Sequence, residues 1–441
     1  MNMHNSISQV EFSQRRRTLL QQLDDNSAVL IQSSPMVSRN SDVDYLFRQN
    51  SNFYYFTGFN EPGALLLLTK NGDIIQYHLF CQPRNQEMEI WFGYRSGEEG
   101  VLANYSADFA YSNEILAQKV PELLNGIDNL YYHWDHSALS ENVHTWLADM
   151  RKRSRQGVIP PSHIIQLSDI SNEMRLFKST AEQEMMRIAS QVSAQAHIKA
   201  MQMCKPSVME YQLDAHIQHH FAMNNCPQAA YPSIVGGGVN SCILHYINND
   251  QSLVAGDLVL IDAGAEYQYY AGDITRTFPV NGKFSKEQSA LYEIVLKANI
   301  ECIEMVKPGA QWNEIHEHAV LVITTGLVEL GLLSGQVNEL IEQAAYREYF
   351  MHKLGHWLGM DVHDVGNYKV DDQWRVLAAG MVMTVEPGIY VAADNMDVDE
   401  CWRGIGIRIE DDVLVTSDGC EVMTKDVPKT VLEIEALMAN N

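Results

Sequence analysis

Apolar residues in the first part of the chain occur as short runs separated by polar and turn-forming residues. Two of these runs, Ala64–Thr69 and Asp73–Phe80, are of the β type, and stretches with a helical pattern lie among such runs. Gln156–Ser162 combines a glycine with two adjacent prolines, which predicts a loop. The pattern predicts a compact α/β domain over residues 1–170 and a second domain over residues 171–441.

The second domain is predicted to open with two helices. Ser179-Thr-Ala-Glu182 resembles a capping box, in which a serine and a glutamate side chain bond to backbone N–H groups of the first turn. It precedes a helical pattern that continues to Ala200. A further helical stretch covers about Val208–Asn224, and strand-like segments follow it.

Four acidic residues lie in or beside the apolar, strand-like segments of the second domain. They are Asp262 in Asp257–Gly264, Asp273 in Gly272–Phe278 after a predicted hairpin bend at Glu266–Tyr270, Glu386 in Met381–Gly388, and Glu410 at the end of Gly404–Glu410. An isolated buried carboxylate is too costly to keep, so each acid needs a partner. Taken singly, each acid could be a solvated charge at a strand end or edge. Convergence on bound cations explains all four together.

Several histidines lie near these acids in the sequence. His352 and His356 are four residues apart, which places them on one face if the segment is helical. His363 follows shortly after, and His245 lies in another apolar run, Ser241–Tyr246. Imidazoles beside a carboxylate site can serve as metal ligand, proton carrier and oxyanion donor near neutral pH.

The combination of carboxylates with one imidazole suits hard or borderline divalent ions, so Mn²⁺, Fe²⁺, Co²⁺ and Zn²⁺ are all compatible with it. Four acids are more than one such ion usually takes from a protein. Bridging carboxylates can hold two ions about 3.5–4 Å apart, with a shared water or hydroxide as the nucleophile. The residues therefore predict a centre with two metal ions.

The ordered set of two aspartates, a histidine and two glutamates resembles the pita-bread metallopeptidases (family M24). Among these, the resemblance is to the Xaa-Pro aminopeptidases (aminopeptidase P), and it runs through nearly the whole chain. The further motifs that carry it are Tyr55–Pro62, Glu89–Gly93, Glu173–Lys178 and His356–Gly366. The resemblance implies an N-terminal α/β domain of the creatinase type. A pita-bread catalytic domain would follow, with a curved antiparallel sheet flanked by helices.

The resemblance also implies roles for individual residues. Asp273 and Glu410 would bridge the two metal ions, Asp262 would complete one ion, and His356 and Glu386 would complete the other. Glu386 would also move a proton to the leaving nitrogen. The remaining site residues would be His363 for the oxyanion, His245 for the substrate or leaving group, Arg408 as a clamp on a ligand carboxylate, and His352, Tyr231 and Tyr390 around the pocket. Trp91 matches a tryptophan that reaches the site from a neighbouring subunit of a homotetramer.

The composition indicates which binding partners and which cellular location to expect for this protein. The formal net charge of −25 argues against nucleic acid or an anionic membrane as a partner, because both favour lysine and arginine patches. The seven cysteines are an odd number without CxxC spacing, which indicates reduced thiols. Arg15–Arg17 reads as an exposed helix face rather than a targeting signal. The location expected from these features is the cytoplasm.

Four functions compete, three of them enzymatic. The favoured one is an Xaa-Pro aminopeptidase that uses Mn²⁺ and acts on peptides with proline at the second position. A prolidase, which demands dipeptides, is the alternative enzyme. A methionine aminopeptidase is less favoured, because this group typically lacks the N-terminal domain. A binding protein without catalysis is less favoured, because such a protein would usually have lost metal ligands. The loop Gln373–Arg375 has fewer arginines than bacterial relatives, which could change the preference for longer peptides.

Overall fold

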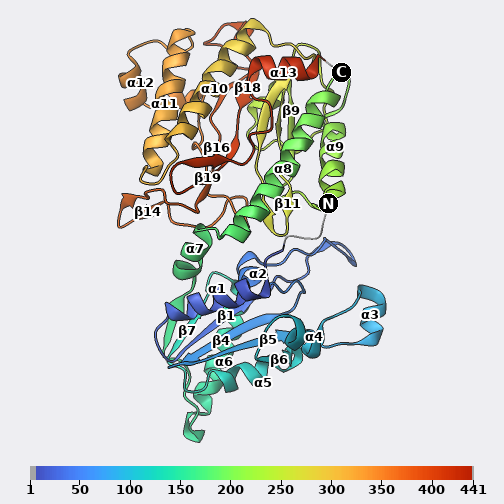
Figure 1. Ribbon diagram of the computed structural model, residues 1–441, viewed down its shortest axis with the longest axis vertical. Coiled ribbons are helices and arrows are strands. Elements are labelled where there is room, and N and C mark those ends of the chain that lie inside the picture. Colours follow the sequence, from blue (N-terminus) through green and yellow to red (C-terminus); the bar gives the residue numbers. More distant parts are fainter. Residues whose placement is uncertain (1–5, 440–441) are drawn as a thin grey trace. The chain divides into compact units, whose positions relative to one another are not determined.

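The computed structural model describes residues 6–439, and within these residues the chain forms two compact units (Figure 1). One unit comprises Ile7–Met174, and the other begins at Arg175. The division falls inside helix α7 (Ser168–Leu176). In the described part of the chain, no helix is both long and apolar enough to cross a membrane.

The N-terminal unit contains a six-stranded mixed sheet with the strand order β6-β5-β4-β1-β7-β8. Strands β1, β4 and β5 pair antiparallel, whereas the β1–β7, β7–β8 and β5–β6 pairs are parallel. The strands are β1 (Ser27–Gln32), β4 (Leu65–Asn71), β5 (Ile74–Cys81), β6 (Phe109–Ser112), β7 (Asn129–Tyr132) and β8 (His163–Gln166), with a separate hairpin of β2 (Ser38–Asn40) and β3 (Val43–Asp44). The predicted strands at Ala64–Thr69 and Asp73–Phe80 are therefore confirmed as β4 and β5.

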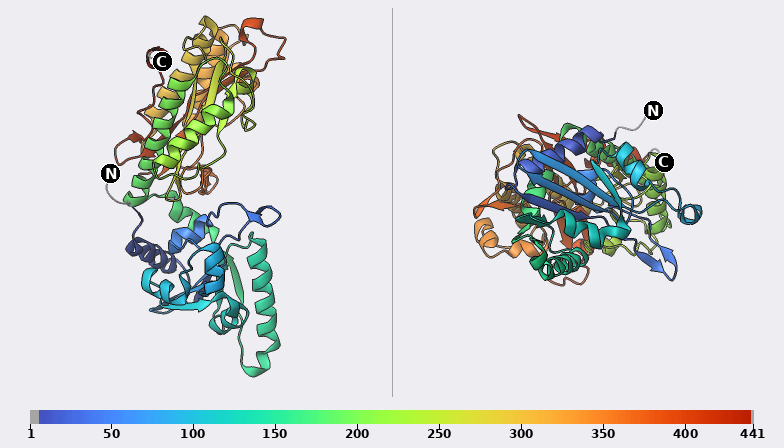
Figure 2. Two further views of the ribbon diagram at one scale, coloured as in Figure 1. Left: turned by 90° about the vertical axis from the view of Figure 1, so that its right-hand side faces the viewer. Right: turned by 90° about the horizontal axis from the view of Figure 1, so that it is seen from below.

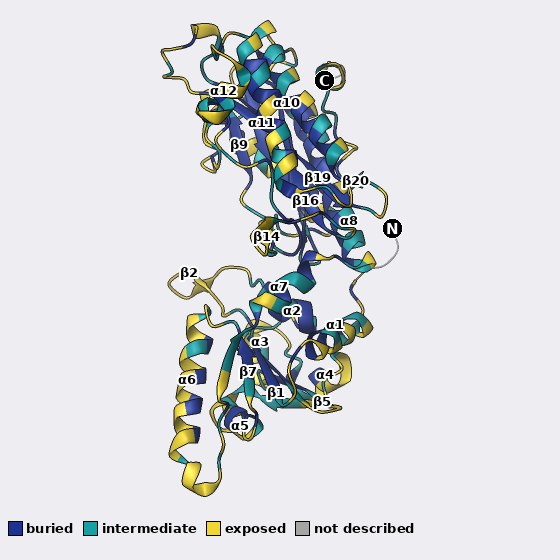
Figure 3. Cartoon of the chain, turned by 90° about the vertical axis from the view of Figure 1, so that its left-hand side faces the viewer, coloured by how far each residue is buried: buried dark blue, intermediate teal, exposed yellow. Residues whose placement is uncertain are grey.

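Helices pack on this sheet, and α6 shows how the spacing of apolar residues decides which face of a helix is buried. Its buried residues, which include Leu139, Val143 and Trp146, recur at helical spacing and pack on Leu30 and Leu67 of the sheet core. The outer face of α6 is exposed (Figure 3). The helices of this unit are α1 (Gln9–Gln21), α2 (Ser51–Thr57), α3 (Gln86–Phe92), α4 (Gly97–Asn104), α5 (Leu116–Leu123) and α6 (Ser137–Lys152).

The arginines near the N-terminus differ from the expectation of an exposed helix face. Arg15 and Arg16 are each only 5% exposed, although Arg17 is exposed. Arg15 donates to the carbonyl of Tyr55 at 3.1 Å, and Arg16 donates to that of Phe56 at 2.6 Å. These carbonyls lie in the last turn of α2, where they lack helical partners and where the helix dipole favours a cation. The prediction was wrong for Arg15 and Arg16 because their partners are distant in sequence.

The second unit combines long helices with antiparallel strands. Helix α8 (Thr180–Met203) packs on α9 (Glu210–Met223), α10 (Lys286–Met305) packs on α11 (Trp312–Glu329), and strands lie between these pairs (Figures 1 and 2). The predicted capping box is present. The side chain of Ser179 accepts the backbone N–H of Glu182, and the side chain of Glu182 accepts the backbone N–H of Ser179. The shorter helices are α12 (Val337–Glu342) and α13 (Val431–Met438).

The strand pairs of this unit are all antiparallel in the part of the chain that the structure describes. The predicted hairpin is present at Glu266–Tyr270, where Gln268 and Tyr269 both have positive φ, as a two-residue turn of this hand requires. The strands form β13-β10-β9, β16-β19-β20, β17-β18, β11-β12 and β14-β15. Their bounds are β9 (Ile234–Gly237), β10 (Leu258–Asp262), β11 (Glu266–Tyr267), β12 (Tyr270–Ala271), β13 (Thr275–Pro279), β14 (Lys369–Val370), β15 (Gln373–Trp374), β16 (Val382–Val385), β17 (Gly388–Val391), β18 (Ile405–Arg408), β19 (Asp411–Val415) and β20 (Cys420–Val422).

A buried ion pair joins β13 to β19. The guanidinium of Arg276 lies 2.7 Å from Asp411, and both side chains are fully buried. Lys429 donates to the other oxygen of Asp411 at 2.7 Å. Burial would raise the pKa of Asp411, but the two cations outweigh burial and lower it. The carboxylate is therefore held in its charged form between two strands that lead into the acidic cluster.

We predict that Asp411→Asn destabilises the protein by about 3–5 kcal/mol, because it leaves the buried Arg276 without its counter-charge. Equilibrium unfolding in urea at neutral pH measures the loss. The control is Lys283→Met, which removes the solvated pair of Lys283 with Glu435 and should cost less than about 1 kcal/mol. Equal stability of the two variants would contradict the prediction.

Candidate metal centre

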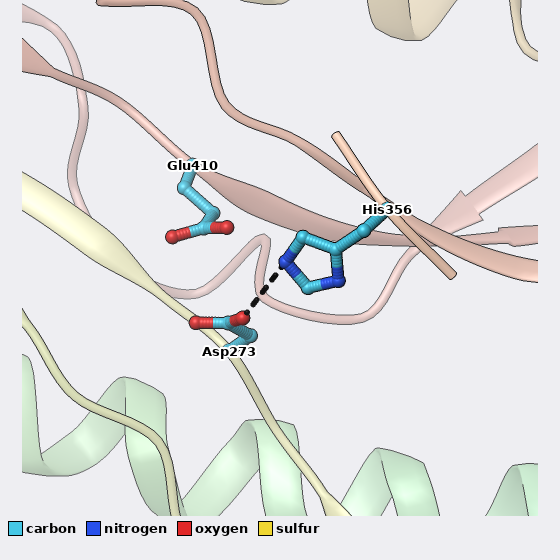
Figure 4. A group of neighbouring side chains, drawn as sticks. All are labelled: Asp273, His356 and Glu410. Carbon is cyan, nitrogen blue, oxygen red and sulfur yellow. Dashed lines mark ion pairs between the residues drawn. The ribbon is translucent and has the colours of Figure 1, made fainter. Parts of the chain in front are cut away.

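Three of the predicted ligands form a tight group. The ligand atoms of Asp273, His356 and Glu410 all lie within 4.8 Å of one another. Nε2 of His356 is 3.4 Å from Oδ2 of Asp273, and Figure 4 shows the three side chains pointing toward one another. Asp273 precedes β13, and Glu410 lies directly between β18 and β19. The backbone thus delivers distant parts of the sequence to one place.

The other two predicted ligands adjoin this group. The hydroxyl of Tyr231 lies 2.6 Å from Oδ1 of Asp262 and also contacts Oδ1 of Asp273. Oε1 of Glu386 is 3.7 Å from Nε2 of His356. The structure therefore brings all five side chains together. The acids lie at strand ends rather than in strand interiors, since Asp262 is the last residue of β10 and Glu386 follows β16.

The segment that carries His352 and His356 is irregular rather than helical. It runs alongside β16, because the backbones of His356 and Thr384 bond at 2.9 Å and the N–H of Glu386 donates to Leu354 at 2.7 Å. A Cβ at Gly355 would come within 2.0 Å of the Thr384 carbonyl, so this approach requires glycine. Pairing with a strand thus replaces the helix that four-residue spacing would allow.

The ring of His356 is oriented by its own backbone neighbour. Its Nδ1 lies 3.0 Å from the carbonyl oxygen of Trp357, which suits an Nδ1–H donor. Such a bond leaves Nε2, the nitrogen that faces Asp273, free to bind a metal ion. Loss of the proton from Nε2 would therefore leave the imidazole in the tautomer that a metal ligand needs.

Arg408 connects several site residues. Its guanidinium donates to Oδ2 of Asp262 at 2.6 Å, to the hydroxyl of Tyr390 at 3.0 Å and to Oγ1 of Thr275 at 3.1 Å. The Thr275 hydroxyl in turn donates to Glu410 at 2.6 Å. Arg408 is 3% exposed, so these contacts are made away from water. Arg408 therefore holds the carboxylate of Asp262, one of the predicted ligands.

The remaining histidines lie around the acids. Nε2 of His352 is 2.9 Å from the Tyr390 hydroxyl, and its Nδ1 is 3.7 Å from Glu386. The ring of His363 is exposed and lies 4.4 Å from that of His356. His245 is also exposed, and it lies near enough to His352 and His363 to count among the minor causes that lower the pKa of both rings, after burial. Three imidazoles therefore surround the ligand group.

Trp91 belongs to the other unit of the chain. It lies in α3 and is 75% exposed, next to the exposed Ile90, Phe92 and Tyr94. Four neighbouring large apolar side chains in contact with solvent are unusual for a monomer. Trp91 and the predicted ligands therefore belong to different compact units of the chain.

Three acids of the site have raised pKa values. Burial raises the pKa of Glu386 to about 7, and it also raises the pKa of Asp273. Burial and the nearby Asp273 and Glu386 raise the pKa of Glu410 well above its usual value. Burial alone would lower the pKa of His356, but its hydrogen bond to Asp273 and the charge of Glu386 raise it to about 9.

These shifts show that negative charge is crowded into a buried site. Bound cations relieve such crowding, and carboxylate oxygens with one imidazole nitrogen form a donor set that suits divalent metal ions. The residues present therefore fit the metal ions that the five-residue pattern predicts.

Sequence reasoning did not identify two supporting residues. Oδ2 of Asp412 accepts the backbone N–H of Asp273 at 3.0 Å and the hydroxyl of Ser190 at 2.8 Å. Thr275 joins Arg408 to Glu410, as described above. The signal for Asp412 was available, because three consecutive acids at Glu410–Asp412 in an apolar region demand partners. Nothing in the sequence marks Thr275 apart from its place two residues after Asp273.

Comparisons with known proteins agree with this geometry. Residues 184–417 match the model of the family described as 'Metallopeptidase family M24', and residues 12–131 match the model described as 'Aminopeptidase P, N-terminal domain'. The chain is 46% identical over 434 residues to the Xaa-Pro aminopeptidase of Escherichia coli (strain K12), and the match covers 98% of each protein. The match extends over both units.

Solved structures give the same result. The aminopeptidase PepP of Pseudomonas aeruginosa matches with a TM-score of 0.98 and 49% identity over 99% of both chains. A zinc-substituted aminopeptidase P of Escherichia coli in complex with product matches with a TM-score of 0.97 and 46% identity, again over 99% of both chains. With its five ligand candidates gathered in one cluster, the chain belongs to metallopeptidase family M24 and carries an aminopeptidase P N-terminal domain.

Proposed function

We propose that this protein is a metal-dependent aminopeptidase that releases the N-terminal residue from peptides with proline at the second position. The observation that carries the proposal is the cluster of five ligand candidates, with Arg408 and three histidines around it, in a chain that matches Xaa-Pro aminopeptidase over 98% of its length. A prolidase is less well supported, because both the N-terminal and the catalytic unit match aminopeptidase P. A binding protein would have no need to keep the complete ligand set.

Two divalent cations would be held by Asp262, Asp273, His356, Glu386 and Glu410, with Asp273 and Glu410 as the shared ligands. We infer that the bound ions are Mn²⁺. Co²⁺, Fe²⁺ and Zn²⁺ suit the same donors. When bound, such ions lower the pKa of a water molecule and polarise the scissile carbonyl. The protein's own contribution is to place proton carriers and hydrogen-bond donors around the reacting bond.

Glu386 is the proposed proton carrier. Its carboxylate lies 3.7 Å from His356 within the ligand group, where it can take a proton from the attacking water and pass it to the leaving nitrogen. His363 is exposed, and its ring lies 4.4 Å from that of His356, where a ring N–H can donate to the oxyanion. His245 would hold the substrate or the leaving group. His352, Tyr390 and Arg408 form a bonded chain that keeps Asp262 and the pocket wall in place.

Proline after the scissile bond makes that bond a tertiary amide without an N–H group. Recognition must then come from the shape of the pocket and from closure of the site. We propose that the N-terminal domain (residues 1–170) contributes this closure for the catalytic domain (171–441), and that the protein is a homotetramer in which Trp91 of one subunit reaches the site of another. The exposure of Trp91 and its apolar neighbours supports this assembly. A cytoplasmic location is proposed because all seven cysteines are unpaired.

The first prediction concerns the substrate. Protein that has been stripped of metal and reloaded with Mn²⁺ should release the first residue from Xaa-Pro-Xaa tripeptides, and a chelator should stop the reaction. Mass spectrometry of the products measures this. Cleavage of Xaa-Pro dipeptides alone would move the assignment to prolidase. Absence of cleavage with two metal ions bound would overturn the proposed function.

The second prediction separates ligands from donors. Glu410→Ala should lower kcat by more than about 100-fold, a larger effect than the loss of a residue that only supports a ligand. The same variant should hold less metal by elemental analysis. His363→Ala should lower kcat by about 100–1000-fold, the range seen for an oxyanion donor, with its metal content retained. Normal metal content in Glu410→Ala, or loss of metal in His363→Ala, would contradict these roles.

The third prediction concerns pH. The folded-state pKa of Glu386 is raised from 4.5 to about 7 and that of His356 from 6.5 to about 9. The metal-stripped folded protein thus binds more protons than the unfolded chain over this range, and its stability falls as pH rises. Metal ions replace these protons, so the rise in Tm caused by a fixed Mn²⁺ concentration should be larger at pH 7.5 than at pH 5.5. Scanning calorimetry measures both values, and a rise that does not depend on pH would contradict the prediction.

A further inference from the structure

Four charged side chains meet beneath the turn that carries His363. The guanidinium of Arg175 lies 2.7 Å from Asp361 and 2.6 Å from Asp364, and Nζ of Lys178 lies 3.0 Å from the other oxygen of Asp364. The side chains of Arg175, Lys178 and Asp364 are at most 2% exposed, whereas that of Asp361 is 39% exposed. We call these four residues the charge quartet.

Stability alone is a weak reason for such a quartet. Removing several charges from water costs much of what their attraction returns, so well-packed apolar side chains could stabilise the same place equally well. Charged hydrogen bonds differ from apolar contacts in their fixed geometry, because an arginine fork holds carboxylates at defined positions. The quartet is therefore better suited to fixing a position than to adding stability.

The two carboxylates flank His363 in the sequence. Asp361 lies two residues before it and Asp364 directly after it. The N–H of Asp364 donates to the carbonyl of Trp357 at 2.9 Å, which closes the turn just after His356. A Cβ at Gly359 would come within 2.1 Å of Asp364 and 2.9 Å of the Lys178 side chain, so the turn is packed directly on the quartet. The exposed imidazole of His363 thus belongs to a turn that is held by the ion pairs of the charge quartet.

The cations of the quartet are themselves fixed. Arg175 lies in the last turn of α7, and Lys178 directly precedes Ser179, the N-cap of α8. The N–H of Lys178 donates to Gly380 at 2.8 Å, and its carbonyl accepts from Gln183 at 2.8 Å. The segment 175–178 therefore forms a rigid anchor for the turn.

We infer that Arg175 and Lys178, acting through Asp361 and Asp364, are positioning residues for His363 and hold its imidazole where it meets the substrate. The inference rests on the proposed function, in which His363 stabilises the oxyanion. None of the four side chains needs to touch the substrate. Their effect on the reaction is transmitted through the placement of one exposed ring, 4.4 Å from His356.

A double-mutant cycle tests the inference. Arg175→Met should lower kcat by about 10–100-fold in the parent protein, the usual cost of losing a residue that orients a site. In the His363→Ala background the same change should cost less than about 3-fold, because the residue it positions is already gone. Asp361→Asn is the gentler variant, since it removes one ion pair at a half-exposed side chain. Its effect should also disappear in the His363→Ala background.

The matched control is Arg187→Met. It breaks another arginine pair of the same unit, with Glu421 at 2.8 Å, where the side chains are 26% and 32% exposed. Its kcat should stay within about 2-fold of the parent, as expected for a partly exposed arginine whose ion-pair partners, Glu184 and Glu421, are not site residues. Equal losses from Arg175→Met in both backgrounds would overturn the inference, and so would loss of bound metal from the quartet variants.

A second measurement does not depend on turnover. The ring Cε1–H resonance of His363 in zinc-loaded, ¹³C-histidine-labelled protein is identified as the signal missing from His363→Ala. It should shift or broaden in Asp361→Asn and stay unchanged in Arg187→Met. An unchanged signal in Asp361→Asn would overturn the positioning role. If the parent binds metal but cleaves no peptide, the proposed function fails, and this spectrum still decides whether the quartet positions the ring.

Discussion

Crowded carboxylates in a buried place are the constraint on which the rest of the catalytic unit depends. Asp273, Glu386 and Glu410 lie near one another with little access to water, and each has a raised pKa. A protein can keep such a group only if cations, donors or protons offset the repulsion. The hydroxyl of Tyr231, the guanidinium of Arg408 and the ring of His356 all do so. Divalent metal ions would complete the balance.

Strand alternation separates one neighbouring acid from this group. Glu410, Asp411 and Asp412 are consecutive, so the side chain of Asp411 leaves the backbone on the face opposite to those of Glu410 and Asp412. Glu410 joins the ligand group, Asp411 pairs with Arg276, and Asp412 accepts the N–H of Asp273. One short run of acids therefore supplies a candidate ligand, a buried ion pair and a support for a second candidate ligand. A shift of one residue in β19 would disrupt all three.

The local patterns that predicted elements correctly depend on contacts within a few residues. The capping box at Ser179 and the two-residue turn after Tyr267 are of this kind, as are the apolar runs of β4 and β5. The prediction that was wrong depended on partners far away in the sequence, because Arg15 and Arg16 are buried and donate to carbonyls about forty residues on. The helix that the spacing of His352 and His356 would allow is replaced by pairing of this segment with β16. Tertiary partners overrode local spacing in both cases.

The sequence by itself determined which residues are candidate ligands, because acids in apolar segments and one histidine in a fixed order carry a chemical meaning that does not depend on geometry. It also determined the family through motifs along the whole chain. Only the tertiary structure decided that the five side chains meet, that Arg408 reaches Asp262, and that Arg175 and Lys178 lie beneath His363. The physical reason is that buried charges are placed by long-range pairing, and the partners of these residues are separated by up to 189 positions.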